Sequence, residues 1–292
     1  METVTATELK EVFRERPRDS HKGTYGYIAL IGGSFRYSGA IRLAYMANCA
    51  MRSGAGVVRI GAPRGICSAI RSDVLESTLF PLSDSDGDLV FIADEMKELT
   101  CGTKSAAFGM GIGSGEETEK ALSWLLKNYQ GRLIIDADGL NALARTDRSI
   151  LRAAAGRVVL TPHPGEFSRL TGKPIRELLT DPAGEAEAYA RETGATVLLK
   201  GAYTTVTDGK ETLRIDRGCA GMATAGSGDV LSGILAAVCA WEGNLLRAAA
   251  AAAWINGRAG ELAQQKYGDI SMAAGDTAGQ IPEVIKEIRS AE

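Results

Sequence analysis

The chain has 292 residues and a formal net charge of −3, with 45% apolar and 24% charged residues. These values are typical of a globular protein long enough to bury its core without a disulfide or metal staple. The low aromatic content of 6% and the lack of a basic stripe argue against nucleic-acid binding.

The N-terminus and the cysteines bear on location. The first residues, METVTATELKEVFRERPRDSHK, are polar and charged and do not form a secretory signal. The longest apolar run, Val230–Trp241, is too short to cross a bilayer. We therefore predict a cytoplasmic protein without membrane contact. The odd number of cysteines and the lack of any metal-like spacing among them are typical of a protein from a reducing compartment. The five cysteines are Cys49, Cys67, Cys101, Cys219 and Cys239.

In chain order, short apolar runs rich in β-branched residues alternate with runs whose apolar residues recur at helical spacing. This alternation predicts a mainly parallel sheet covered by helices on both faces. The predicted strands are Tyr27–Ile31, Val57–Gly61, Ala106–Gly109, Leu133–Asp136, Val158–Thr161 and Val197–Lys200. The helices between them include Ala40–Ser53, Glu117–Tyr129 and Pro182–Thr193.

The last third of the chain departs from this alternation. The runs Tyr203–Asp208 and Thr212–Asp216 flank an Asp-Gly-Lys turn, which predicts a hairpin at an antiparallel edge of the sheet. Two helices are predicted after it, Gly228–Trp241 and the alanine-rich Asn244–Gln265.

The domain organisation is predicted from the lack of any linker, repeat or low-complexity tract. An α/β fold of this length is often a single domain. We predict an N-terminal extension over residues 1–21 and one domain over residues 22–292.

A glycine-rich segment, Gly221–Asp229, precedes the first of the two late helices. Glycines let the backbone approach a ligand, and the free N–H groups at a helix start form an anion site. An aspartate there would repel a phosphate unless it is a base that takes a proton from an attacking hydroxyl. The alternative is an ordinary turn in which Asp229 caps the helix. The segment resembles the G-x-G-D signature of ribokinase-like kinases, in which the aspartate is the catalytic base.

A second motif, Thr-Pro-His-Pro-Gly-Glu, ends one predicted strand and opens a helix. Its polar residues, His163 and Glu166, lie at the carboxyl end of a parallel strand, where α/β folds bind ligands. The alternative is that Glu166 only caps the helix. The spacing resembles the N-x-x-E motif of ribokinase-like enzymes, which helps to position magnesium and phosphate. With histidine in place of asparagine, the motif resembles the NAD(P)H-hydrate dehydratase family more than the sugar or vitamin kinases.

Further stretches match that family in the same order, over about residues 22 to 288. They are Gly32-Gly33-Ser34, Tyr37–Ala40, Gly109–Gly113, Asp136–Leu143 and Lys200–Thr204. Met110 replaces the family's usual proline, and Ala225 replaces a usual glycine.

Two of these stretches leave alternatives open. The carboxylates of Asp136 and Asp138 could orient the site or the water around magnesium, or they could cap the next helix. Lys200 could neutralise a phosphate, or it could be an exposed lysine before a turn.

The resemblance implies a three-layer α/β/α ribokinase-like fold with a mainly parallel central sheet and no separate lid domain. It implies a carbon–oxygen lyase that dehydrates (6S)-NADHX or NADPHX to NADH or NADPH, a nicotinamide-nucleotide repair reaction. The hydroxyl of the hydrate is phosphorylated by ADP or ATP with Mg²⁺. Phosphate then leaves with help from the ring nitrogen's electron pair, and AMP or ADP is the other product. The sequence does not decide between ADP and ATP or between NADHX and NADPHX.

The resemblance also implies the roles of individual residues. Asp229 is the base, and the backbone of Gly226, Ser227 and Gly228 forms the anion hole. Glu166 supports magnesium. The residues implied to contact the hydrated nicotinamide are Ala40, Gly111, Gly113, His163 and Asp229. The residues implied to line the nucleotide site are Lys200, Gly201, Ala202, Tyr203, Thr204 and Gly228.

The expected partners are small molecules, together with other copies of the chain in a homo-oligomer such as a tetramer. A functional link to a separate NAD(P)HX epimerase is also expected, because the N-terminal extension is too short to be one. Two alternatives stay open. One is a vitamin kinase of the hydroxyethylthiazole or hydroxymethylpyrimidine type, which shares the anion hole. The other is a non-enzymatic nucleotide-binding sensor, against which the intact Asp229 argues.

Overall fold

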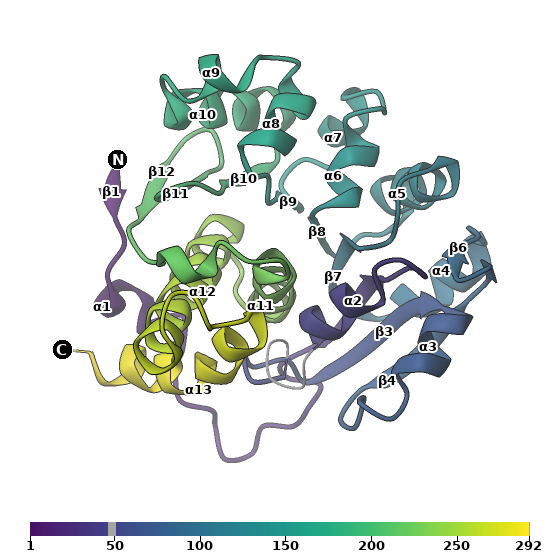
Figure 1. Cartoon of the computed structure of the whole chain (residues 1–292), viewed down its shortest axis with the longest axis horizontal. Helices are drawn as coiled ribbons and strands as arrows, with labels where there is room; N and C mark the ends of the chain where they lie inside the picture. The colour runs from purple at the N-terminus through teal and green to yellow at the C-terminus, as the bar shows by residue number, and fades with distance from the viewer. Residues whose placement is uncertain (46–50, 292) are drawn as a thin grey trace.

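A mostly parallel sheet runs through the middle of the molecule, with helices on both of its faces (Figure 1). The computed structural model describes residues 1–45 and 51–291. Within these residues the strand order of the large sheet is β1-β12-β11-β10-β9-β8-β7-β2-β3-β4, and a separate small sheet pairs β5 with β6. The strands are β1 (Glu2–Thr3), β2 (Tyr27–Gly32), β3 (Val57–Pro63), β4 (Thr78–Leu82), β5 (Asp84–Ser85), β6 (Asp88–Leu89), β7 (Thr103–Met110), β8 (Arg132–Ile135), β9 (Val158–Leu160), β10 (Thr196–Leu199), β11 (Thr204–Thr207) and β12 (Thr212–Ile215).

Alternate residues of the central strands β2, β7, β8, β9 and β10 enter two separate cores. Ile28 and Leu30 of β2 pack into one core, and Ala29 and Ile31 pack into the other. The first core is covered by α1 (Ala6–Leu9), α2 (Ser38–Tyr45), α3 (Arg64–Ile70), α11 (Ser227–Trp241), α12 (Leu245–Tyr267) and α13 (Ala274–Ser290). The second is covered by α4 (Ala93–Thr100), α5 (Glu116–Asn128), α6 (Asp138–Leu143), α7 (Ser149–Ala153), α8 (Pro164–Thr171), α9 (Ile175–Leu178) and α10 (Pro182–Thr193).

This arrangement confirms the predicted three layers and the mainly parallel sheet. Each predicted strand is present with ends within a few residues of the prediction. The predicted hairpin is also present, because β11 pairs antiparallel with both β10 and β12. The sequence prediction missed β4, which pairs with β3 at the far edge. Of the predicted helix Ala40–Ser53, residues 46–50 lie outside the described residues, and residues 51–54 form a turn.

The first 21 residues are packed onto the rest of the molecule. Strand β1 pairs with β12, and Leu9, Val12 and Phe13 are buried in the first core. The ring of Phe13 lies edge-on to Trp241 at the end of α11, with 5.3 Å between the ring centroids.

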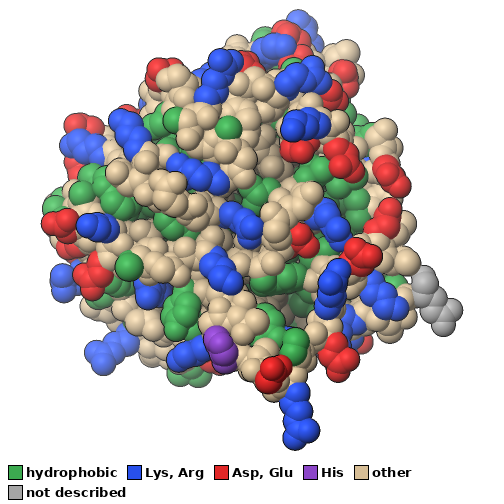
Figure 2. All heavy atoms as spheres, turned by 180° about the vertical axis from the view of Figure 1, so that it is seen from behind, with side chains coloured by type: hydrophobic (Ala, Val, Ile, Leu, Met, Phe, Trp, Pro, Cys, Tyr) green, Lys and Arg blue, Asp and Glu red, His purple; other side chains and the backbone are tan. Residues whose placement is uncertain are grey.

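The surface carries charges of both signs, as the small net charge of the sequence leads one to expect. Acidic and basic side chains are interspersed on the face seen in Figure 2. No helix in the described part of the chain has the length and apolar character needed to span a membrane. Cys49 lies outside the described residues, and the other cysteines are free thiols: Cys67, Cys101, Cys219 and Cys239.

Candidate functional site

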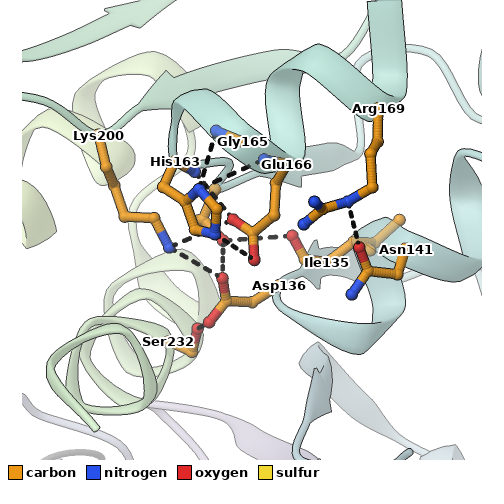
Figure 3. A network of polar contacts seen from close by, with 10 residues as sticks. Ile135, Asp136, Asn141, His163, Gly165, Glu166, Arg169, Lys200 and Ser232 are labelled. Carbon is orange, nitrogen blue, oxygen red and sulfur yellow. Dashed lines mark hydrogen bonds and ion pairs between the residues drawn. The ribbon is translucent and has the colours of Figure 1, made fainter. Parts of the chain in front are cut away.

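Polar side chains from three neighbouring strand ends meet the start of α11 (Figure 3). Asp136 follows β8, His163 lies two residues after the Thr161 that follows β9, and Lys200 follows β10. These strands are adjacent and parallel, so their carboxyl ends share one edge of the sheet. This edge is where ligands bind in open α/β folds.

Asp136 is the centre of the polar network. Its carboxylate is 2% exposed and accepts hydrogen bonds from the hydroxyls of Thr161, at 2.7 Å, and Ser232, at 2.8 Å. Lys200 Nζ lies 3.3 Å from its Oδ1. Asp136 therefore ties the sheet to α11 and orients Lys200. It does not cap the following helix, whose N-cap residue is Ala137 and has no side-chain capping bond.

Lys200 is a partly buried cation, not an exposed lysine before a turn. Its Nζ lies 3.8 Å from Glu166 Oε2 in addition to its contact with Asp136, and its side chain is 25% exposed. Burial alone would lower the pKa of Lys200, but the carboxylates of Asp136, Glu166 and Asp229 raise it. Lys200 therefore keeps its positive charge at the edge of the sheet.

His163 and Glu166 form a capping box at the start of α8. His163 Nδ1 accepts from the backbone N–H groups of Gly165, at 3.0 Å, and Glu166, at 3.3 Å, and Glu166 Oε2 accepts from the His163 N–H at 2.8 Å. Because Nδ1 is an acceptor, the proton of the neutral ring is on Nε2. Burial, with Lys200 and Arg169, lowers the pKa of His163 and favours this neutral form. His163 and Glu166 thus cap α8, and they also lie at the carboxyl end of β9, where a ligand could reach them.

Asp229 lies in the first turn of α11 but does not cap it. The N-cap residue is Gly226, and there is no side-chain capping bond. The capping alternative for Asp229 is therefore wrong. Burial raises the pKa of Asp229 to about 7, and Asp136 and Asp138 add to this effect while Lys200 opposes it. A carboxyl group with a pKa near neutrality suits a general base.

The start of α11 presents backbone N–H groups beside Lys200. Gly226 has a φ of 96°, and a Cβ there would lie 2.3 Å from Leu43 Cδ1, so the position requires glycine. A Cβ on Gly228 would lie 3.5 Å from Lys200 Nζ, which places this turn against the lysine. Ala225 is not among the described residues with a positive φ, so alanine fits there without strain.

A cavity of about 460 Å³ adjoins this turn. Five of the six residues predicted to bind nucleotide line it: Lys200, Gly201, Ala202, Thr204 and Gly228. Tyr203 instead lines a neighbouring cavity of about 320 Å³, and its ring lies under the guanidinium of Arg214 at 4.1 Å.

The prediction missed the far wall of the larger cavity. This wall is formed by Arg217, Asn256 and Gly257, among others. Asn256 is 8% exposed, and its Oδ1 has no hydrogen-bond partner in the protein. No motif in the sequence marked these residues, because α12 reaches the cavity only through its packing in the fold.

Four of the five residues predicted to contact the hydrated nicotinamide are linked to one another through close contacts around Asp138; His163 is not among them. A Cβ on Gly111 would lie 2.7 Å from the Cβ of Ala40, which shows how closely the two segments approach. The N–H of Gly113 donates to Asp138 Oδ2 at 2.9 Å. Since Asp138 also acts on the pKa of Asp229, this group lies close to the proposed base.

The described residues include no cluster of three or more His, Cys, Asp or Glu side chains that could enclose a metal ion. The Glu166 carboxylate already accepts the His163 N–H through Oε2, and its Oε1 lies 3.4 Å from His163 Nε2. These residues are compatible with a magnesium ion held mainly by phosphate oxygens and water, which is how this ion commonly binds.

The comparisons with known proteins agree with this geometry. Residues 28–283 match the model of the NAD(P)H-hydrate dehydratase family. An ADP-dependent (S)-NAD(P)H-hydrate dehydratase from Cenarchaeum symbiosum is 36% identical, over 96% of this chain and 95% of its own length. A bifunctional NAD(P)H-hydrate repair enzyme from Moorella thermoacetica is also 36% identical, over 98% of this chain but only 54% of its own length. This chain thus spans about half of such bifunctional relatives.

A solved structure is similar to this chain over almost its whole length. The ADP/ATP-dependent NAD(P)H-hydrate dehydratase from Bacillus subtilis, co-crystallised with ATP and Mg²⁺, is 28% identical and has a TM-score of 0.83, with 98% of each chain covered. The ribokinase-like fold predicted from the sequence is confirmed.

Proposed function

Because this chain belongs to the NAD(P)H-hydrate dehydratase family, we propose that it dehydrates (6S)-NADHX and NADPHX to NADH and NADPH with a nucleotide as phosphate donor. The observation that carries the proposal is the position of Asp229. This half-buried carboxyl group with a raised pKa lies at the start of α11, next to Lys200 and the cavity of about 460 Å³. The roles that we propose for individual residues are the ones that the resemblance to this family implied in the sequence analysis.

In the first step, Asp229 takes the proton of the hydroxyl on C6 of the hydrated ring. The oxygen attacks the terminal phosphorus of the nucleotide, an O–P bond forms, and the bond to the leaving AMP or ADP breaks. The N–H groups of Gly226, Ser227 and Gly228 stabilise the charge that develops on the phosphoryl group. Lys200 adds a fixed positive charge on the same side.

In the second step, the electron pair of the ring nitrogen expels phosphate from C6. Loss of a proton from C5 then restores the double bond of the dihydropyridine. His163, as a neutral ring with a proton on Nε2, would hold the substrate by donating a hydrogen bond. Ala40, Gly111 and Gly113 would form the wall against which the nicotinamide lies.

Magnesium would enter with the nucleotide and neutralise charge on its phosphates. We propose that the buried Glu166 carboxylate faces the water shell of this ion and does not coordinate the metal directly. Its Oε2 already accepts the His163 backbone N–H at 2.8 Å.

We propose ADP as the preferred donor, since the relative from Cenarchaeum symbiosum is named ADP-dependent. A functional link to an NAD(P)HX epimerase is supported by the relatives named bifunctional repair enzymes. The cytoplasmic location and the homo-oligomer stay predictions.

The test is to incubate the purified protein with NADHX, Mg²⁺ and either ADP or ATP. We expect the absorbance of the reduced nicotinamide to return, with one AMP and one phosphate formed per NADH when ADP is the donor. A stable phosphorylated product without return of NADH would instead support the vitamin-kinase alternative. Nucleotide binding without turnover of NADHX would support a sensor.

A further inference from the structure

Arg169 lies beside the candidate site without a role in the mechanism above. It is in α8, three residues after Glu166, and its Nε donates to Asn141 Oδ1 of α6 at 2.8 Å (Figure 3). The Arg169 side chain is exposed. Since one bond uses only Nε, the two terminal amino groups of the guanidinium stay available for a ligand.

The guanidinium is close to the proposed substrate-binding histidine. A Cβ on Gly165 would lie 3.1 Å from His163 Nδ1 and 4.0 Å from Arg169 Nη1. The positive charge of Arg169 also lowers the pKa of both His163 and Glu166. It therefore borders the nicotinamide side of the site.

The charges of the site create a need for a cation at this place. The site is rich in carboxylates, since Asp136 and Asp138 both raise the pKa of Asp229, and Asp136 also raises that of Glu166. Lys200 interacts with three of them and lines the nucleotide cavity. The hydrated dinucleotide carries a diphosphate between its two ribosyl groups, and this anion would be repelled unless a second cation met it. In the described residues, the cations whose charge lowers the pKa of His163 are Lys200 and Arg169.

We propose that Arg169, held by Asn141, binds the diphosphate of NADHX and NADPHX and so positions the hydrated ring against His163 and Asp229. A guanidinium with two free amino groups suits a bidentate contact with phosphate oxygens. This inference rests on the proposed dehydratase function and adds a substrate-binding residue to it.

The test compares Arg169→Gln with wild type on two substrates. One is NADHX, and the other is hydrated dihydronicotinamide riboside, which has the same reacting ring but no phosphate. For NADHX we expect KM to rise about 10- to 100-fold, with kcat and the KM for ADP within about twofold of wild type. For the riboside hydrate we expect kcat/KM to be the same in both proteins.

Several outcomes would overturn the assignment. An equal loss on the riboside hydrate would mean that Arg169 acts through the rest of the site. A raised KM for ADP would place it on the nucleotide phosphates, and a loss confined to NADPHX would place it on the 2′-phosphate. If wild type turned over neither hydrate, the proposed function itself would fail, which is a separate result.

Arg145→Gln is the matched control. Arg145 is another exposed arginine, paired with Glu119 on α5, and its loss should leave every kinetic constant unchanged. Asn141→Leu should raise the KM for NADHX by less than Arg169→Gln, because the guanidinium remains but loses its anchor.

Discussion

At the scale of single residues, Asp229 shows how position sets chemistry. The same side chain on the surface would be fully ionised and far too weak a base for a hydroxyl. At the start of α11, burial and the carboxylates of Asp136 and Asp138 raise its pKa to about 7. Lys200 limits the rise and keeps the ionised form accessible at neutral pH.

We predict that Asp229→Asn lowers kcat for dehydration by about 10²- to 10⁴-fold, which is the usual range for loss of a general base. The amide keeps the shape but cannot accept the proton. Nucleotide affinity should not fall, because a negative charge beside the phosphates is removed. Single-turnover kinetics and ADP titration by calorimetry measure both effects. A folded variant within a few-fold of wild-type kcat would remove Asp229 from the mechanism.

The same variant should change how stability depends on pH. A carboxyl pKa raised from 3.8 to about 7 means that the folded protein holds this proton more tightly than the unfolded chain does. The group therefore costs stability as pH rises from about 4 to about 7. Relative to wild type, Asp229→Asn should gain up to about 4 kcal/mol in unfolding free energy across this interval, since each pKa unit corresponds to about 1.4 kcal/mol, with a plateau above it. Urea denaturation at several pH values measures the difference, and a pH-independent offset would contradict this prediction.

His163 has a capping role and a proposed substrate role, which two substitutions can separate. His163→Ala removes both, and we expect about 1 kcal/mol less stability together with a raised KM for NADHX. His163→Asn keeps a side chain suited to the N-cap position, so stability should recover while the KM for NADHX stays raised. Thermal denaturation and steady-state kinetics provide the comparison. If His163→Asn also restored the KM, the cap alone would explain the histidine.

At the scale of elements, the turn from β8 into α6 holds two site carboxylates on either side of Ala137. Ala137 has a φ of 47° and a ψ of −116°, a conformation that residues with a Cβ rarely adopt. Asp136 turns toward Lys200, and Asp138 turns toward the Gly113 N–H. Backbone strain is often found at functional sites, and here it points the two carboxylates at different parts of the site.

We predict that Ala137→Gly stabilises the protein by about 0.5–2 kcal/mol, because relief of strain of about 1–3 kcal/mol exceeds the entropy cost of glycine. Ala144→Gly is the control, since Ala144 has an ordinary φ of −62° and should lose stability on substitution. Chemical denaturation measures both variants. Equal destabilisation by the two glycines would show that Ala137 is not strained.

At the scale of the whole molecule, the first 21 residues contribute to the core of the domain. Strand β1 extends the sheet beyond β12, and Phe13 packs on Trp241 at the end of the helix that begins at the proposed anion hole. The two ends of the chain also meet, since Lys10 Nζ donates to the Ala291 carbonyl at 2.8 Å. The extension therefore packs against the C-terminal end of α11, whereas the candidate site lies at the N-terminal end of this helix.

We predict that Phe13→Ala lowers the unfolding free energy by about 2–4 kcal/mol, because a ring that is 7% exposed leaves a cavity. The kinetic constants of the folded variant should stay close to wild type, since Phe13 does not reach the site. Phe13→Leu, which keeps most of the volume, should lose much less stability. Thermal denaturation with activity assays below the transition checks the separation. A wild-type melting temperature for Phe13→Ala would show that the extension is only loosely attached.

The sequence by itself indicated the central strands, the hairpin and several of the longer helices, and the places where the main motifs lie. Apolar periodicity is a local property, so it marked the buried runs that became β2, β3, β7, β8, β9 and β10. The motif around His163 and the glycines before Asp229 were likewise visible as short runs of residues. Strand β4 was missed because its run, Thr-Leu-Phe-Pro-Leu, is short and contains a proline that an edge position tolerates.

Only the tertiary structure decided which of these residues act on one another. Ser232 donates to Asp136 across 96 positions, and Asn256 of α12 reaches the proposed nucleotide cavity from a helix without any motif. The raised pKa of Asp229 likewise requires burial and charges contributed by other segments. Electrostatic and hydrogen-bond energies depend on distance in space, and the distance along the chain does not specify it.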